Sequence, residues 1–98
     1  MTKIKSTDVK EAIKNRSKVL IAFIDSNSLL SISTLKILRD IKESATAQIF
    51  YVDVEESRES ISDYSLRIIP TIHLYESGIL TKKLILPYSK EDLECLIQ

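Results

Sequence analysis

The stretch Tyr64-Ser65-Leu66-Arg67-Ile68-Ile69-Pro70-Thr71 runs directly into a β-rich segment, Thr71-Ile72-His73-Leu74-Tyr75. Pro70 fixes its own φ and has no backbone N–H, so it suits the position just ahead of a strand and not its interior. X-Pro bonds are also the ones that can be cis where a tight approach is needed. Taken alone, however, this proline is also compatible with a trans bond that simply opens a strand.

Further strands are indicated on both sides of this stretch. Downstream, Ser77-Gly78 predicts a tight turn, and Leu80–Ile85 returns as the second strand of a hairpin. Upstream, Gln48–Val54 is a second β-rich run. Val19–Ile24 is a continuous apolar run, which is typical of a strand covered on both faces.

Four helices are expected around these strands. Asp8 is the predicted N-cap of the first helix. From residue 29 to residue 44 apolar positions recur every three residues, which predicts the longest helix, and residues 55–64 suit a short one. Ser89 is expected to cap the last helix, with Asp92 in the capping-box position. This order of elements predicts an α/β protein with a mixed central sheet.

Length, charge and hydropathy narrow the possible classes of protein. Residues 1–98 suit a single domain. Fourteen basic and fourteen acidic residues cancel, so no global field favours nucleic acid or an anionic membrane as a partner. The apolar run at residues 19–24 is too short to span a bilayer, and the N-terminus has no apolar signal-peptide core. We therefore expect a cytoplasmic protein that binds neither nucleic acid nor membrane.

Cysteine and histidine usage makes resident metals and cofactors unexpected. Cys95 is the only cysteine, so the chain can form neither an internal disulfide nor a multi-cysteine zinc site. His73 is the only histidine and lies within a predicted strand, where we expect it to be hydrogen-bonded. We predict no metal site and no cofactor.

The chain resembles the thioredoxin family over roughly residues 6 to 97. Ile69-Pro70-Thr71 resembles the family's cis-proline signature, and residues 64–71 are similar to its Tyr-x-Ile-Arg-x-Ile-Pro-Thr run. Residues 51–56 resemble the strand end Lys-Val-Asp-Val-Asp-Glu, and residues 19–23 the strand that leads to the active site. The resemblance implies a thioredoxin fold, with a central mixed sheet, helices on both faces and a cis-proline before the third strand of the core.

In this register the family's Trp-Cys-Gly-Pro-Cys motif falls on Asn27-Ser28-Leu29-Leu30-Ser31, with serine at both cysteine positions. The family's chemistry needs a thiolate at a helix N-terminus, where the helix dipole and free N–H groups lower the thiol pKa to about 7. A serine hydroxyl there stays protonated and forms no mixed disulfide. We therefore assign no catalytic residue, and Ser28 and Ser31 are interpreted as degenerate active-site positions that could simply cap the helix.

Three other departures from the family pattern agree with this interpretation. The buried aspartate that assists proton transfer in the family falls at Ala22, and its lysine partner falls at Tyr51. Neither is needed once no thiol requires a base. The groove glycine beside the cis-proline falls at Leu86, which should fill or reshape the groove.

The resemblance also implies a binding surface, because in the family fold the loop before the long helix, the cis-proline turn and the turn before the last helix converge. Here that surface would carry five aliphatic residues and no reactive group, unless several of them pack inward. A protein or peptide partner, or a second copy of the chain, would bind there. The expected surface comprises Asn27, Ser28, Leu29, Leu30, Ser31, Ile68, Ile69, Pro70 and Leu86.

Three functions remain open at this point. The first is a redox-inactive thioredoxin-like protein that serves as a protein-binding or adaptor module through the former active-site surface. The second is an enzyme, a thiol–disulfide oxidoreductase whose two active-site cysteines were replaced by serine for crystallography. The third is a structural subunit that buries the apolar surface in a homodimer.

Overall fold

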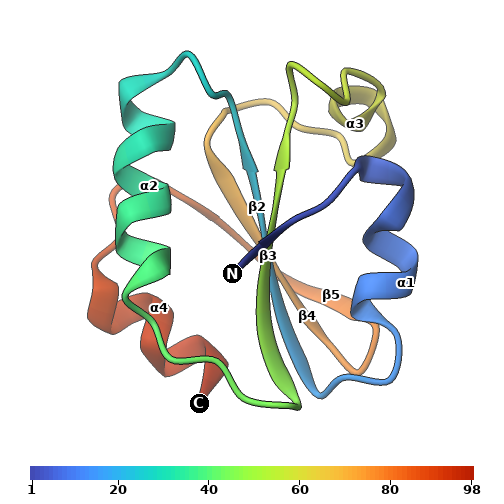
Figure 1. The fold of residues 1–98 in the computed structure, drawn as a ribbon, viewed down its shortest axis with the longest axis vertical. Helices are drawn as coiled ribbons and strands as arrows, with labels where there is room; N and C mark the ends of the chain where they lie inside the picture. The colour runs from blue at the N-terminus through green and yellow to red at the C-terminus, as the bar shows by residue number, and fades with distance from the viewer.

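The computed structural model describes residues 1–98 and contains a five-stranded sheet with helices on both faces (Figure 1). The strands lie in the order β1-β3-β2-β4-β5. Their bounds are β1 (Thr2–Lys3), β2 (Lys18–Ile24), β3 (Ala47–Asp53), β4 (Thr71–Glu76) and β5 (Ile79–Ile85). Strands β1 and β2 pair with β3 in parallel, whereas β4 is antiparallel to both β2 and β5. The predicted α/β fold with a mixed sheet is confirmed.

The helices form two layers. Figure 1 shows α2 and α4 on one side of the sheet, and α1 and α3 on the other. The helical bounds are η1 (Ser6–Asp8, a 3-10 turn), α1 (Val9–Ile13), α2 (Leu29–Arg39), α3 (Glu59–Asp63) and α4 (Lys90–Ile97). No helix combines the length and the apolar character that crossing a membrane requires.

Strand β2 lies at the centre of both layers. Residues 19–24 are each at most 1% exposed. The even-numbered residues of this run belong to the hydrophobic cluster under α2 and α4, and the odd-numbered ones to the cluster under α1 and α3. Successive side chains of a strand point to opposite faces, so a run without polar residues supplies both cores at once. The expectation of a strand covered on both faces is correct.

The ends of several helices differ from the predicted ones. The predicted 29–44 helix ends at Arg39, with Asp40 as its C-cap. Beyond it Ile41 is still buried in the core, which is why the apolar spacing continues past the helix. The chain must then turn into β3, and it does so through paired backbone hydrogen bonds between Ser44 and Ala47. Helix α3 is likewise shorter than residues 55–64.

The capping signals were partly right. Ser89 and Asp92 form the predicted capping box at the start of α4. Asp8 stands at the N-cap of α1, but its side chain makes no capping bond to that helix. Its carboxylate instead accepts a hydrogen bond from the Lys5 backbone N–H, one short turn earlier. The 3-10 turn η1 precedes α1 without a break, so Asp8 caps the composite segment and not α1 alone.

Strand β1 was not expected from the sequence. It pairs Thr2 with Phe50 and Lys3 with Tyr51 along the outer edge of β3. Lys3 also forms an ion pair with Glu56, beyond the end of β3. A two-residue strand has no periodicity of its own, so only its long-range partners define it.

Candidate functional site

The serine pair lies where the chain leaves β2 and enters α2. Ser28 is the N-cap of α2, and its Oγ accepts a hydrogen bond from the Ser31 backbone N–H at 3.3 Å. Ser31 is completely buried, and its Oγ accepts one from the Asp25 backbone N–H at 3.0 Å. Both hydroxyls are therefore used to close the loop, while Asn27 between them and β2 is exposed.

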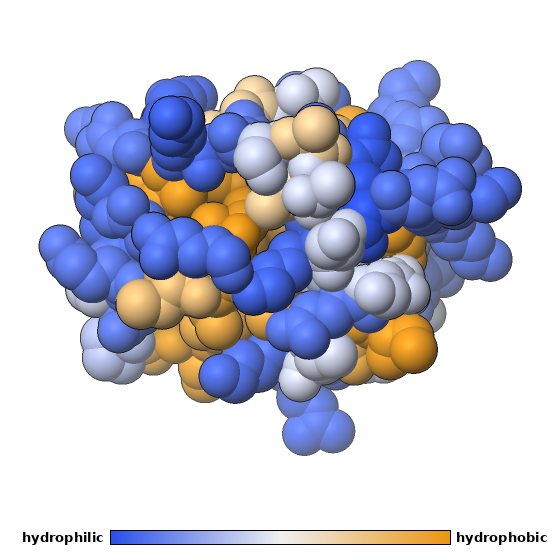
Figure 2. All heavy atoms as spheres, turned by 90° about the horizontal axis from the view of Figure 1, so that it is seen from below, coloured by the Kyte–Doolittle hydropathy of each residue, from blue (hydrophilic) through white to orange (hydrophobic).

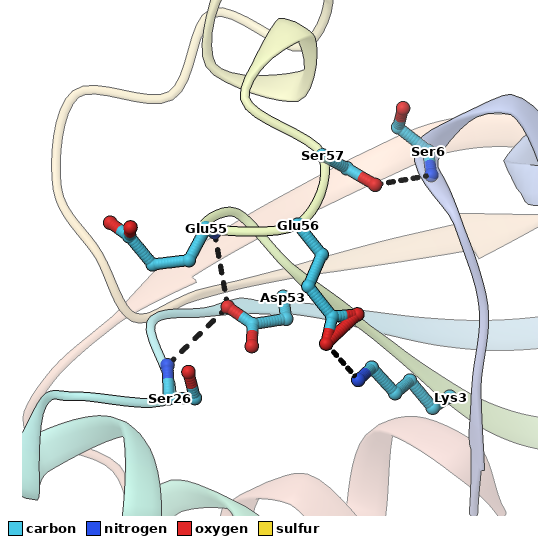
Figure 3. A network of polar contacts seen from close by, with 7 residues as sticks. All are labelled: Lys3, Ser6, Ser26, Asp53, Glu55, Glu56 and Ser57. Carbon is cyan, nitrogen blue, oxygen red and sulfur yellow. Dashed lines mark hydrogen bonds and ion pairs between the residues drawn. The ribbon is translucent and has the colours of Figure 1, made fainter.

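A second set of contacts fixes the same loop from the side of β3 (Figure 3). Asp53, at the end of β3, is almost fully buried. Its Oδ1 accepts hydrogen bonds from the backbone N–H groups of Ser26, at 3.4 Å, and Glu55, at 3.1 Å. The Asp53 carboxylate thus joins the loops that follow the two central parallel strands. No role for Asp53 was expected from the sequence, although an acidic residue at the end of a buried strand is the signal that could have revealed it.

The proline turn enters β4 beside this loop. The Ile69–Pro70 peptide bond is cis, and Pro70 is buried. Ile69 packs against the core cluster under α1 and α3. A second cis bond, Leu86–Pro87, lies between β5 and α4 and was not anticipated from the sequence.

The five aliphatic residues of the expected surface divide into two groups. Leu29, Leu30 and Ile68 are 82%, 58% and 53% exposed. Ile69 and Leu86 are half-buried, so these two pack partly inward. Figure 1 places the segment that leads into β4 at the same end of the molecule as the N-terminus of α2.

The hydropathy of the opposite end is different. Figure 2, viewed from below, shows apolar surface set in a hollow and surrounded by hydrophilic residues. A cavity of about 430 Å³ lies there, with Ile41 and Ile97 among its lining residues and Lys42, Glu43 and Glu94 beside them. None of the residues predicted for the site lines this cavity.

Comparison with known proteins bears on the fold. No protein-family model and no curated protein matches the sequence. Among solved structures, a mutant thioredoxin from Halobacterium salinarum NRC-1 is similar with a TM-score of 0.84 and 19% identity, over 98% of this chain and 88% of that chain. The chain has the thioredoxin fold.

Two further solved structures support the thioredoxin fold. Mitochondrial thioredoxin 3 from Saccharomyces cerevisiae has a TM-score of 0.80 and 24% identity, covering 99% of this chain and 92% of that one. Trxlp from Edwardsiella tarda EIB202 has a TM-score of 0.79 and 13% identity, covering 99% and 98%. At these identities the likeness establishes the fold.

Within this thioredoxin fold, His73 does not meet its prediction. It is 1% exposed, and its Nδ1 has no hydrogen-bond partner, contrary to the expected hydrogen-bonded strand residue. The ring instead contacts the ring of Phe23 edge-on, with centroids 4.9 Å apart. Burial, and secondarily the charge of Lys83, lower the pKa of His73 from 6.5 to about 4.

The capping role of Ser28 can be measured directly. Replacing Ser28 by Ala removes the acceptor of the Ser31 N–H and should lower the free energy of unfolding by about 1 kcal/mol. Replacing Ser28 by Asp, which keeps an acceptor and adds a favourable charge at the helix N-terminus, should retain wild-type stability. Urea denaturation of the three proteins tests this, and equal midpoints for Ser28→Ala and wild type would contradict the capping role.

Burial of neutral His73 should make stability depend on pH. Between pH 6.5 and about 4 the unfolded chain binds a proton at His73 that the native chain does not. Stability should therefore fall as the pH drops through this window, by up to about 3 kcal/mol in total. Carboxylates titrate in both proteins, so the comparison is with His73→Leu, which should show a smaller loss over the same window. Parallel pH profiles of unfolding free energy would contradict this expectation.

Proposed function

We propose that this protein is a redox-inactive thioredoxin-like module that binds a protein or peptide partner. The proposed binding surface is formed by the first turn of α2 and the turn before β4. The observation that carries the proposal is the exposure of Leu29 and Leu30 directly beside two serines whose hydroxyls are engaged in backbone hydrogen bonds. This surface offers apolar contact area and no thiol.

The cysteine content of the chain supports the absence of dithiol chemistry. Thiol–disulfide exchange within one chain requires two cysteines that can form a disulfide. Cys95 is the only cysteine and lies in α4, whereas the serine pair stands at the N-terminus of α2, toward the opposite end of the molecule (Figure 1). The resemblance to thioredoxins places Ser28 and Ser31 where the family carries its two reactive cysteines.

The core beneath the serine pair supports the same proposal. Ala22 of β2 and Tyr51 of β3 are register partners, Ala22 fully buried and Tyr51 half-buried against the same cluster. By the resemblance, these positions hold the family's proton-transferring aspartate and its lysine. A laboratory replacement of two cysteines alone leaves such partners unchanged. Their absence argues against the alternative of an engineered oxidoreductase, which the gene sequence at codons 28 and 31 distinguishes directly.

The exposed leucines supply the binding free energy in this proposal. Leu29 is the most exposed of the large apolar side chains. Burying one such side chain completely stabilises a complex by roughly 1.5–3 kcal/mol. Single exposed leucines are ordinary, but neighbouring ones on one helical turn form a patch. A partner segment laid across the first turn of α2 and the turn before β4 would cover Leu29, Leu30 and Ile68.

If the protein is redox-inactive because serines stand at positions 28 and 31, replacing both serines by cysteine should create disulfide-reducing activity. Wild type should not accelerate insulin reduction by dithiothreitol. The double variant Ser28→Cys/Ser31→Cys should form an internal disulfide and accelerate the reaction, because residues three apart in a first helical turn lie within disulfide reach. The matched control is Ser33→Cys/Lys36→Cys, which has the same spacing on α2 without the helix N-terminus. Turnover by wild type, or equal activity of the two double variants, would contradict the proposal.

The surface itself is tested by charge insertion at exposed positions. In a pull-down from the native host, Leu29→Asp and Ile68→Asp should each retain at least tenfold less of the same host protein than wild type retains. Each variant would bury a charge against the partner. Ile79→Asp, in the β4–β5 hairpin, should retain it, because Ile79 is 67% exposed, between the values for Leu29 and Ile68, but lies outside the proposed surface. Circular dichroism verifies that all three variants fold. Sedimentation of wild type distinguishes a second copy from a different partner, and equal loss in all three variants would refute the assigned surface.

A further inference from the structure

A separate cavity, of about 370 Å³, lies on the side of the sheet that carries α1 and α3. The loop after α3 and the neighbouring strands β4 and β5 form its walls. Three features of the lining carry the inference: two cationic side chains, Arg67 and Lys83, a buried imidazole, His73, and an apolar rim from Ile68 and Ile85.

Strand register explains why these side chains meet. His73 of β4 lies directly opposite Lys83 of β5, and Thr71 lies opposite Ile85. Directly opposite residues of an antiparallel pair point to the same face, with Cβ atoms about 4.5–5.5 Å apart. The sheet therefore holds the lysine stem beside the imidazole, independently of any loop.

The charge of the cavity is unbalanced. Arg67 and Lys83 line it, and no acidic residue does. Neither cation takes part in any of the ion pairs that the chain forms. Two uncompensated positive charges in a concave site raise the local concentration of anions.

The imidazole adds a second, independent observation. His73 is 99% buried and lines the cavity, yet its Nδ1 finds no hydrogen-bond partner in the protein. Nδ1 itself is enclosed, so a ligand in the cavity does not reach it. The other ring nitrogen, Nε2, is not enclosed and also makes no hydrogen bond to the protein. With its pKa lowered to about 4, the ring is neutral at pH 7 and has one N–H to donate. In the tautomer protonated at Nε2, a ligand oxygen beside the ring would accept that hydrogen bond.

We propose that this cavity binds a small organic anion. Its carboxylate or phosphate group lies between Arg67 and Lys83 and accepts a hydrogen bond from His73, and its apolar part packs against Ile68 and Ile85. The inference goes beyond the partner surface proposed above and does not depend on it, although Ile68 belongs to both.

The single histidine makes the test direct, because every imidazole C–H signal in an NMR spectrum comes from His73. The wild-type protein is titrated at pH 7 with hexanoate in one arm and inorganic phosphate in another, against sodium chloride at matched ionic strength. We expect a saturable shift of the His73 signals in at least one arm. The arm that saturates at lower concentration identifies a carboxylate or a phosphate as the preferred group.

Variants of the two cations locate the site. Arg67→Gln and Lys83→Gln should each weaken binding about tenfold, since each removes a charge-assisted hydrogen bond. The matched control is Lys82→Gln, because Lys82 lies opposite Leu74 and points to the other face of the sheet. It should leave the affinity unchanged.

The proposal is overturned if neither anion gives a saturable shift, if chloride gives the same shift, or if Lys82→Gln weakens binding as much as Lys83→Gln. The readout uses a small anion and purified protein, so its failure would not affect the partner surface. Loss of the partner in Leu29→Asp would in turn leave this titration unchanged.

Discussion

The double-sided burial of β2 is the constraint on which the rest of the structure depends. A strand that is apolar on both faces must be covered twice, and its edges must be paired as well. Two separate clusters, of 11 and 10 buried residues, meet on the two faces of β2. Strands β3 and β4 take its edges. The end of β2 at Ile24 is therefore held on every side, and the loop that follows leaves from a fixed point.

After β2 ends, hydrogen bonds to backbone N–H groups determine the shape of the loop that leads into α2. The first N–H groups of a helix have no partner within the helix and need an acceptor. A thiolate at this position would be stabilised by the same N–H groups that a serine oxygen satisfies as a cap. Ser28 supplies one of these acceptors, because its hydroxyl oxygen accepts the Ser31 backbone N–H. Asp53 adds a second anchor for the loop, so its shape does not require a disulfide.

Local signals in the sequence predicted the parts of the fold that local physics determines. The continuous apolar run gave β2, and a capping box gave the start of α4. Strand β1 was not predicted because only its pairing with β3, far along the chain, defines it. The end of α2 at Arg39 was misplaced because Ile41 remains buried after the helix stops, so hydropathy does not mark the boundary.

In the candidate site, too, local features could be predicted from the sequence, whereas features set by long-range packing could not. Serine at an N-cap is a local preference, and Ser28 could be interpreted from the sequence alone. Exposure is not local: Leu29 protrudes whereas Leu86, on the same expected surface, is half-buried, and only the packing of distant elements decides between them. Likewise, the sequence could not predict that His73 Nδ1 lacks a hydrogen-bond partner. That depends on the side chains that β2 and β5 bring to both sides of β4.

His73 and Lys83 form an arrangement that works against the stability of the protein alone. A cation opposite a buried imidazole disfavours protonation of the ring, and the unpartnered Nδ1 adds a desolvation cost. The proposed anion would offset the first effect, because its charge attracts the lysine, and it would accept a hydrogen bond from the Nε2–H of the ring. Local arrangements that oppose stability are expected where a site serves a ligand. Ile68 lies at the rim of this cavity and is also one of the exposed aliphatic residues at this end of the molecule.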